Sequence, residues 1–462
     1  MRRHWITLSL LTVAGISFAV MQTLVIPAIP FFKHEFGASQ ADTTWLVTGF
    51  LLSSSVFTPL LGKLGDMYGK RRLLVISLAV FGLGSLAAAA GDSLGWLVAC
   101  RVLQGTGAAV FPLAFGIIRD EFPAERVGVA VGVMSSVFGV GGGLGLVGSG
   151  FVLDELSWHW LFIFGGAPVL VAAALIWAFV PESPVRRGGR PDFLGAAVLS
   201  AALVSLLLAI TKGEAWGWTS LPIVALVLAS GAAFSGWLQL ERRVAEPLVD
   251  LATFTRPGMA WTNSATVLVG FSLTAFFVLM PAFVRVDSYG YGASLTETGL
   301  YFIPSAVAMI VCGPIAGWIG TRVGHAIPLR IGMTASTVAL ILLAFAHHDP
   351  ALALVWMGLL GTGIAFALAA IGSLVIEHSE ASETGVASGV NMIMRTIGAS
   401  IGAQVGAAVI SAHTPAGALV PDEIGFTIAF ASAAVASALA LIPAFAVGRR
   451  RRLRLRPALN PA

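Results

Sequence analysis

The chain is organised as a series of long apolar runs separated by short polar segments. A membrane-spanning helix needs about 20 predominantly apolar residues. Fourteen such runs follow one another along the 462 residues, at 5–31, 43–63, 73–91, 95–118, 127–152, 159–180, 193–211, 219–239, 259–284, 295–320, 326–347, 351–375, 384–410 and 424–447. The pattern predicts an all-α membrane protein with 14 transmembrane helices, and the even number places both termini on one side of the bilayer.

Composition agrees with this pattern, and the distribution of charge gives an orientation. Charged residues make up only 11% of the chain, against about 25% in soluble proteins. With a cytoplasmic N-terminus, 22 Lys and Arg residues fall in cytoplasmic segments and 3 in outer loops. Because basic residues accumulate on the cytoplasmic side, we expect a protein of the bacterial cell membrane with both termini in the cytoplasm. The basic excess then reports topology, and we expect no nucleic-acid partner.

The two ends of the chain resemble each other at a spacing of about 256 residues. Three stretches recur: 62–69 at 317–324, 104–107 at 360–363, and 128–132 at 385–389. Two related membrane halves are typical of secondary transporters. We expect a six-helix bundle at 1–182, an inserted helix pair at 183–240, a cytoplasmic linker at 241–258, a second six-helix bundle at 259–448 and a basic cytoplasmic tail at 449–462.

The predicted cytoplasmic loop between spans 2 and 3 combines glycine and charge. Residues 62–72 have the sequence GKLGDMYGKRR. Glycines let two helix ends approach closely, and a carboxylate can accept hydrogen bonds from a helix N-terminus or an arginine. We expect a mechanical latch, the latch motif, formed by Gly62, Asp66, Gly69, Lys70 and Arg71. The alternative is a basic loop that only sets topology.

This loop resembles the cytoplasmic loop signature of the major facilitator superfamily. Span 4 (RVLQGTGAA, 101–109), the turn SWHWLF (157–162) and the run 385–402 resemble the fourteen-span drug:proton antiporter family in particular. The resemblance implies the major facilitator fold, with two six-helix bundles plus two inserted helices. It also implies export of drug-like molecules and a coupling role for Arg101, since the family uses this arginine in coupling.

Two arginines lie inside predicted spans, where a charge costs about 2.5–3.5 kcal/mol on insertion scales. Arg101 lies near the outer end of span 4, with Gln104 three residues on. It either faces the transport pathway or snorkels to the outer headgroups. Arg395 lies near mid-bilayer in span 13 and shares a helix face with Asn391. For this pair, a structural clamp and a pathway role are equally open.

No acidic residue lies in the middle of a predicted span, although proton coupling normally needs a protonatable group in the pathway. The antiporters that the chain resembles often have an aspartate in span 1, where this chain has Met21. Glu297, at the outer mouth of span 10, is the best remaining candidate, and an ordinary acid at a helix start is the alternative. The sequence therefore leaves proton coupling open.

Small and aromatic residues complete the predicted pathway. Gly141, Gly145 and Gly150 belong to a close-packing face of span 5. It resembles the antiporter signature, but Leu146 replaces the family's proline. Spans 1, 2, 4, 5, 9, 10, 12 and 13 should line the cavity, with the candidates Gln22, Trp45, Phe50, Phe111, Asn263, Phe271, Phe276 and Phe302. A lining without acids suits an apolar, neutral or anionic solute.

These patterns favour a secondary active transporter that exports small amphipathic or drug-like molecules by alternating access, with proton antiport left open. The alternative is a carrier for one neutral or anionic metabolite with different coupling or none. We expect no enzyme, because the sequence has no phosphate loop, no HExxH and no nucleophile–base pair. We also expect no cofactor and no metal site. The expected partners are a small-molecule substrate, the lipid bilayer and, for antiport, protons, and the expected functional unit is a monomer.

Overall fold

The computed structural model describes residues 2–185, 188, 190–244, 246–415 and 420–454, and this part of the chain contains helices and no strands. Among the described residues, fourteen helical segments are long and apolar enough to cross a membrane, which confirms the predicted number. The spans are α1 (Arg2–Leu24), α4 (Trp45–Tyr68), α5 (Lys70–Ala89), α6 with α7 (Leu94–Gln104, Val110–Glu121), α8 (Ala124–Glu155), α9 (His159–Phe179), α10 (Phe193–Trp216), α11 (Leu221–Glu241), α13 with α14 (Pro257–Thr274, Met280–Val284), α15 with α16 (Leu295–Leu300, Ile303–Val323), α17 (Ala326–Phe345), α18 (Pro350–His378), α19 (Thr384–Ala412) and α20 with α21 (Glu423–Leu439, Leu441–Arg454). The short helices α2 (Ile29–Glu35) and α12 (Leu251–Thr255) lie between spans, and α3 (Gln40–Thr43) leads directly into α4 at the start of the second span.

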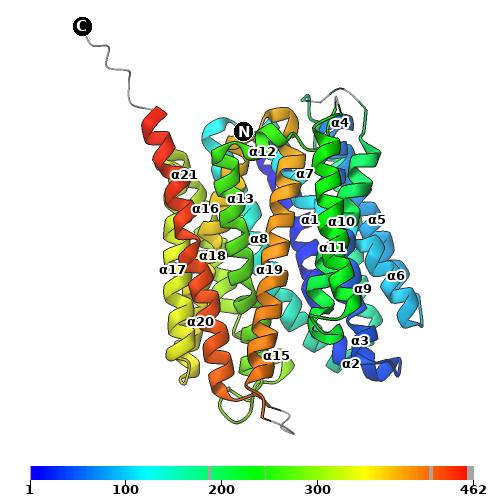
Figure 1. The fold of residues 1–462 in the computed structure, drawn as a ribbon, viewed down its shortest axis with the longest axis vertical. Coiled ribbons are helices and arrows are strands. Elements are labelled where there is room, and N and C mark those ends of the chain that lie inside the picture. Colours follow the sequence, from blue (N-terminus) through cyan, green and yellow to red (C-terminus); the bar gives the residue numbers. More distant parts are fainter. Residues whose placement is uncertain (1, 186–187, 189, 245, 416–419, 455–462) are drawn as a thin grey trace.

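The spans run side by side, and α1 begins at the same end of the bundle at which α21 ends (Figure 1). This agrees with an even number of membrane crossings. The charge bias predicts that this end faces the cytoplasm, so we call it the predicted cytoplasmic end and the opposite one the predicted outer end.

Several predicted spans are interrupted, among them spans 1, 4 and 9. Within the apolar run at 5–31, α1 ends at Leu24, shortly before Pro27, which has no N–H and disfavours the α conformation of its predecessor. The chain becomes helical again at Ile29, in α2. Span 4 passes through a 3₁₀ segment, η1 (Gly105–Ala109). Span 9 contains a π-helical turn, η2 (Ala275–Leu279), just before Pro281, whose ring would clash with a carbonyl one turn earlier. Each interruption changes the direction in which the later side chains of that span point.

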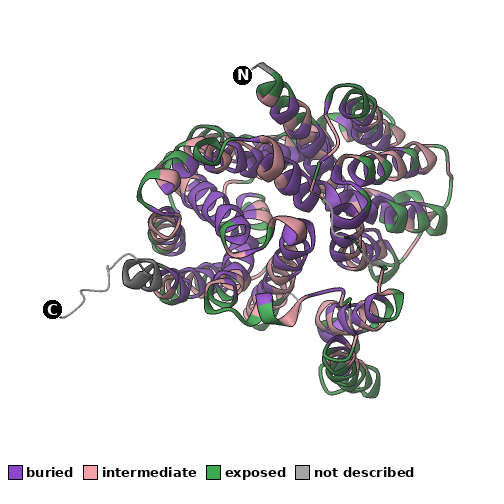
Figure 2. Ribbon diagram, turned by 90° about the horizontal axis from the view of Figure 1, so that it is seen from above, coloured by how far each residue is buried: buried purple, intermediate pink, exposed green. Residues whose placement is uncertain are grey.

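The buried apolar residues form two large cores, one built mainly from α1 to α9 and the other mainly from α13 to α21. Seen from above, buried residues lie on the helix faces turned toward neighbouring helices (Figure 2). Helices α10 and α11 pack on each other, and α10 also contacts α4 and α19. The fold is therefore two six-helix bundles plus two inserted helices. The boundaries at 182, 240, 258 and 448 stay predictions, and residues 455–462 of the predicted tail lie outside the described residues.

Two helix pairs that join the halves are equivalent under the sequence repeat: α4 packs on α19, and α8 packs on α16. A methyl group added at Gly62 of α4 would lie 2.5 Å from the carbonyl oxygen of Gly385 on α19. Its repeat mate Gly317 on α16 approaches the carbonyl of Gly128 on α8 even more closely. Only glycine permits this backbone approach. Two of the three repeated stretches thus form the two matching interfaces, here called the α4–α19 and α8–α16 interfaces.

A second layer of each interface pairs a glycine with a proline of the opposite half. A methyl group added at Gly389 would lie 2.9 Å from the Cα atom of Pro59. In the other interface, a methyl group added at Gly132 would lie 3.1 Å from the Cα atom of Pro314. The repetition of this contact supports an approximate two-fold relation between the halves.

The same relation appears inside each half, between the first and fifth helices of the bundle. Thr23 on α1 donates its hydroxyl to the carbonyl of Gly141 on α8, at 2.8 Å. Thr274 on α13 donates to the carbonyl of Ala399 on α19, at 3.1 Å. Each threonine also lies against a glycine of the partner helix, Gly145 and Gly402. The packing of span 5 on span 1 is therefore repeated by span 13 on span 9.

Candidate transport site

The latch motif connects the two halves at the predicted cytoplasmic end. Asp66, in the last turn of α4, is fully buried. Its two carboxylate oxygens accept hydrogen bonds from the backbone N–H groups of Gly385 and Val386, at 3.1 and 3.0 Å. These N–H groups lie in the first turn of α19, where amides have no acceptor in their own helix and the helix dipole favours a negative charge. Asp66 therefore caps a helix of the opposite half.

Lys70 connects this carboxylate to span 4. Its Nζ atom lies 3.7 Å from Asp66 Oδ1 and 2.6 Å from Asp120 Oδ2. All three side chains are buried, so the ammonium group compensates two carboxylates that are removed from water. Gly69 has a φ of 116°, a value that favours glycine, and turns the chain from α4 into α5.

Arg71, the last residue of the latch motif, acts within the first half. Its guanidinium group donates to the carbonyl of Val180 at 3.0 Å and lies 4.7 Å from the ring centre of Trp177. Its backbone N–H donates to Glu182 Oε1 at 3.0 Å. The structure thus places Gly62 and Asp66 at the contact between the halves, with Lys70 behind them, while Arg71 holds α5 to the end of α9.

Arg119, at the end of α7, makes a further contact between the halves that the sequence did not suggest. Its guanidinium group donates to Thr384 Oγ1 at 2.7 Å, to Ser379 Oγ at 3.0 Å and to the carbonyl of Glu380 at 3.0 Å. In the sequence, Arg119 is one of the 22 basic residues of the predicted cytoplasmic segments. Its place at the end of a span gave no sign that it would reach the start of α19.

Arg101 is buried, with 1% of its surface exposed, so its side chain does not reach the outer headgroups in this conformation. Its Nε atom donates to the carbonyl of Leu46 at 2.9 Å, and Nη1 donates to Gln104 Oε1 at 2.7 Å. The guanidinium carbon lies 4.3 Å from the ring centre of Phe50. Within the described part of the chain, the buried Nε2 of Gln104 has no hydrogen-bond partner. This amide group therefore has a free donor inside span 4, directly before η1.

Asn391 and Arg395 have different surroundings despite their shared helix. The Asn391 amide donates to Asn263 Oδ1 and Thr266 Oγ1 on α13, both at 2.8 Å, as a structural clamp would. The Arg395 guanidinium carbon lies 4.3 Å from the ring centre of Phe138 on α8, in the opposite half. Phe138 in turn stacks on Phe111 at 4.3 Å. No side-chain hydrogen bond or ion pair is found for Arg395 among the described residues.

A small cavity lies between the halves in this conformation. It has about 30 Å³ of free volume, enough for one or two water molecules. Its lining comes from spans 1, 2, 4 and 13: Phe18, Gln22, Phe50, Leu51, Ser54, Ser55, Thr58, Ala108, Met392, Ile393 and Thr396. These residues are apolar or neutral and polar, and a drug-sized solute would need the helices to move apart.

Of the eight predicted cavity residues, Gln22 and Phe50 line this cavity. Trp45 lies toward the predicted outer end, where its ring centre is 4.9 Å from Lys212 Nζ. Phe276 and Phe302 pack against each other at 4.8 Å inside the second core. The others contact neighbouring helices: Phe111 through Phe138, Asn263 through Asn391, and Phe271 through the close approach of its backbone to Gly402.

The remaining predicted residues have local packing or capping contacts. Glu297 forms a capping box with Ser294 at the start of α15 and is exposed, which accounts for an acid there without a coupling role. Met21 is buried against Gly165 of α9, and the neighbouring Gln22, with Phe18, lines the cavity from span 1. Gly141 and Gly145 pack on α1, and Gly150 packs on Thr296.

Comparison with known proteins places this architecture in one family. The family model described as Major Facilitator Superfamily matches residues 11–403. The tetracenomycin C resistance and export protein of Streptomyces glaucescens is 30% identical over 402 residues, which cover 86% of this chain and 74% of the relative. The methyl viologen resistance protein SmvA of Salmonella typhimurium is 30% identical over 431 residues, covering 91% and 85%. The multidrug resistance protein Stp of Mycobacterium tuberculosis is 28% identical over 416 residues, covering 89% and 77%.

Solved structures share the fold at low sequence identity. The human organic anion transporter MFSD10 superimposes with a TM-score of 0.66 at 16% identity, covering 96% of this chain and 99% of that one. The proton:xylose symporter XylE also gives a TM-score of 0.66, at 15% identity, covering 96% and 95%. The family model, the bacterial relatives and the fold agree with the repeated interfaces described above, and the chain is an integral membrane transporter that belongs to the Major Facilitator Superfamily.

Proposed function

We propose that this protein exports small amphipathic molecules across the cell membrane by alternating access. Its relatives are named for drug resistance and export. The observation that carries the proposal is the pair of glycine interfaces that close the predicted cytoplasmic end around an interior cavity. Contacts of bare backbone can separate and re-form without rearranging side chains, as a rocking motion of two halves requires.

The interior chemistry supports a neutral or anionic substrate. No acidic residue lines the cavity, and Arg395 is a cation without a hydrogen-bonded partner in the described chain. Four aromatic rings in consecutive contact connect the two arginines. The Arg101 guanidinium group contacts Phe50, and the Arg395 guanidinium group contacts Phe138. Between these two rings, Phe50 contacts Phe18, Phe18 contacts Phe111, and Phe111 contacts Phe138. Aromatic faces with a cation at each end suit a flat apolar molecule that carries an acidic or carbonyl group.

The second candidate function is transport of one small polar metabolite. The hydroxyl and amide groups of Gln22, Ser54, Ser55, Thr58 and Thr396 favour it, because together they could bind a hydrated solute. The cavity lining holds no carboxylate that could carry a proton. For either substrate, we therefore propose proton antiport as the driving force only if an imposed pH gradient changes the flux.

Flux into proteoliposomes separates these candidates. The panel contains an uncharged aromatic compound, a lipophilic organic anion, a lipophilic organic cation and a sugar, each with and without an imposed pH gradient. We expect transport of the first two and little of the cation. Transport of the sugar alone would favour the metabolite carrier, and transport without any effect of the gradient would reject proton antiport.

Replacing Arg395 by leucine tests the substrate class. We expect the apparent affinity for the organic anion to fall about tenfold or more, because a hydrogen bond to a charged group contributes about 1.5–3 kcal/mol. The affinity for the uncharged compound should change little. The measurement is concentration-dependent flux together with the thermal unfolding temperature of the purified protein.

Arg322→Leu is the matched control, since the Arg322 guanidinium lies 4.1 Å from the ring centre of Trp318 but is exposed. It removes the same type of contact outside the transport path and should leave flux unchanged. If Arg395→Leu lowers only the unfolding temperature, Arg395 is a structural clamp and the proposed anion contact is wrong.

A further inference from the structure

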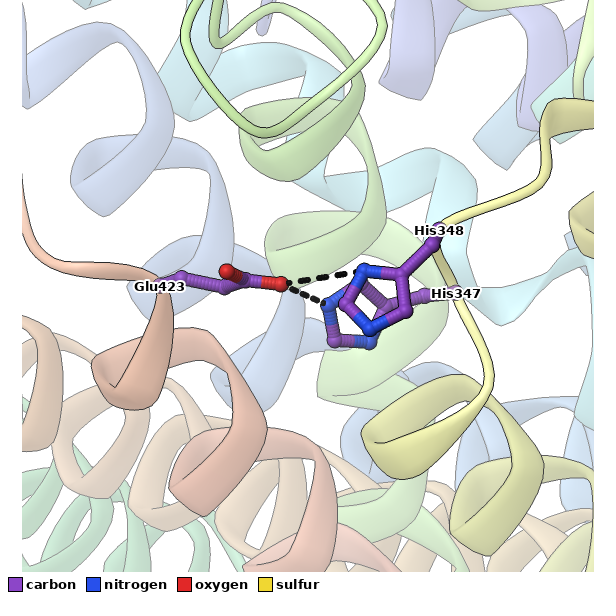
Figure 3. Close-up of side chains that lie close together, drawn as sticks. All are labelled: His347, His348 and Glu423. Atoms are coloured by element: carbon purple, nitrogen blue, oxygen red, sulfur yellow. Dashed lines mark hydrogen bonds and ion pairs between the residues drawn. The ribbon is translucent and has the colours of Figure 1, made fainter.

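Three side chains that can bind metal ions come together at the predicted outer end of the second half. His347 and His348 lie in the turn between α17 and α18, and Glu423 is the first residue of α20 (Figure 3). Glu423 Oε1 lies 2.8 Å from His347 Nε2 and 3.4 Å from His348 Nδ1. The three ligand atoms all lie within 4.8 Å of one another.

The hydrogen bonds of His347 prepare its outer nitrogen for a cation. Nδ1 lies 2.8 Å from the carbonyl oxygen of Leu343, so this nitrogen carries the proton and donates. In a neutral imidazole, Nε2 then has a lone pair that points at the carboxylate oxygen of Glu423. A metal ion bound between these two atoms would accept a lone pair from each. A histidine that donates one nitrogen to a backbone carbonyl and offers the other is the arrangement found at metal sites.

The spacing of the donors fits zinc. Two ligand atoms bound to a tetrahedral zinc ion, each about 2.0–2.2 Å from it, lie about 3.4 Å apart. The distance from His348 Nδ1 to Glu423 Oε1 already has this value. Rotation of the carboxylate can lengthen the distance from His347 Nε2 to Glu423 Oε1, which is 2.8 Å. Glu423 and His348 are 37% and 76% exposed, so an ion can enter from solvent, and water can occupy the fourth position.

The backbone around these ligands is held in place. Tyr291 donates its hydroxyl to the carbonyl of His347 at 2.5 Å, and Tyr289 donates to the carbonyl of Pro421 at 2.6 Å. Burial, with the nearby carboxylates of Asp422 and Glu423, raises the pKa of Tyr289, so its hydroxyl stays protonated and keeps donating. One loop between α14 and α15 thus fixes both segments that supply ligands.

We propose that His347, His348 and Glu423 form a zinc-binding site. Two imidazoles and a carboxylate are a donor set that zinc prefers. The site joins the α17–α18 turn to the start of α20, both within the second half. Zinc therefore stabilises this end of the bundle and leaves the interfaces between the halves free to move. No local spacing in the sequence indicates the site, because the third ligand lies 76 residues from His347.

The test uses the full chain, purified in detergent with a tag that contains no histidine. Bound zinc is measured by competition with a chromophoric chelator, and the unfolding temperature is measured with and without zinc. We expect one zinc ion per chain and a zinc-dependent rise in the unfolding temperature. His348→Ala and Glu423→Gln should each weaken binding by at least about tenfold and abolish the rise, since even changes next to metal ligands cost 10–100-fold.

His159→Ala is the matched control, because His159 lies at the same predicted outer end, 4.0 Å from the single carboxylate of Asp92. It should bind zinc as the unchanged protein does. His348 is exposed, so its replacement should leave the metal-free unfolding temperature unaltered. Absence of stoichiometric binding, or equal binding by the unchanged protein and both ligand variants, would overturn the proposal. Neither result bears on transport, which the flux panel tests separately.

Discussion

The α4–α19 and α8–α16 interfaces have the same backbone contacts but different polar chemistry. In the first, Asp66 lies one helical turn beyond Gly62 and binds two amides of α19. In the second, the equivalent residue beyond Gly317 is Thr321, whose hydroxyl donates to Trp318 of its own helix at 2.8 Å. The Thr321 methyl carbon would lie 2.7 Å from a methyl group added at Gly128. One interface therefore adds a charged hydrogen bond to the glycine contact, and the other adds an apolar contact.

The starting points of the two helices explain this difference. Helix α19 begins at Thr384, so the amides of Gly385 and Val386 have no acceptor in their own helix. Helix α8 begins at Ala124, so the amide of Gly128 already lies in the second turn and bonds within the helix. A carboxylate at position 321 would therefore not meet amides left free by the start of α8. The latch therefore requires both an acidic side chain and the free amides at the start of a helix. Packing of glycine against glycine requires neither of these.

The largest expected effect comes from replacing the glycines at which the helix backbones meet in both interfaces. Gly62→Val and Gly317→Val each place a side chain where the opposite backbone lies, so neither interface can close. We expect both variants to lose more than about nine-tenths of transport, as a misfit of about 1.4 kcal/mol or more in the closed state would produce. Labelling of a Ser388→Cys reporter, on α19 and buried in this conformation, should rise in both.

The control for this pair is Gly231→Val, because a methyl group added at Gly231 of α11 has open space around it. Normal transport by Gly317→Val, with Gly62→Val inactive, would show that only the α4–α19 interface must close. The two interfaces would then be unequal in function despite their matching geometry.

A smaller effect is expected at Asp66, the charged residue of the α4–α19 interface that Thr321 replaces in the α8–α16 interface. Asp66→Asn removes a buried charge from the α19 amides and directs an N–H₂ group toward one of them. The closed state should lose about 1.5–3 kcal/mol, the contribution of a hydrogen bond to a charged group. Transport should slow while substrate affinity stays unchanged, and Ser388→Cys labelling should increase. Thr321→Val keeps the methyl contact and should match the unchanged protein in flux and labelling.

If Thr321→Val and Asp66→Asn lowered transport equally, the two positions would have the same role. The explanation from the different starting points of α19 and α8 would then be wrong. Unchanged turnover in Asp66→Asn would reject the latch and leave the motif as a determinant of topology.

The architecture was predictable because its signals are local. Run length and hydropathy gave the fourteen spans, and the recurrence of 62–69 at 317–324 indicated two related halves. The breaks before Pro27 and Pro281 follow from local sequence too, but their consequence for side-chain direction depends on packing. The equivalence of Thr23 and Thr274 was not predicted, because the number of residues between them differs slightly from the spacing of the three repeated stretches.

The site was less predictable, because lipid and protein interior are both apolar. In a span that is hydrophobic on all sides, the sequence does not fix which face turns inward. Gln22 and Phe50 line the small cavity, whereas Phe276 and Phe302 lie in a core. Asp66 was expected to bind a helix start or an arginine. Which helix start it meets, 319 residues away, depends on the packing of the halves.

The smallest expected effect tests whether the equivalence extends inside the halves. Thr23→Val and Thr274→Val each remove one interhelical hydrogen bond while keeping side-chain volume. Such bonds in membrane proteins contribute about 0.6 kcal/mol on average and at most about 1.7. Both variants should therefore lower the unfolding temperature slightly and equally, with transport retained, and Thr→Ser at either position should restore it. If only Thr23→Val lowers it, the first bundle depends on this contact and the second does not. The repeat would then describe the interfaces between the halves better than the packing within them.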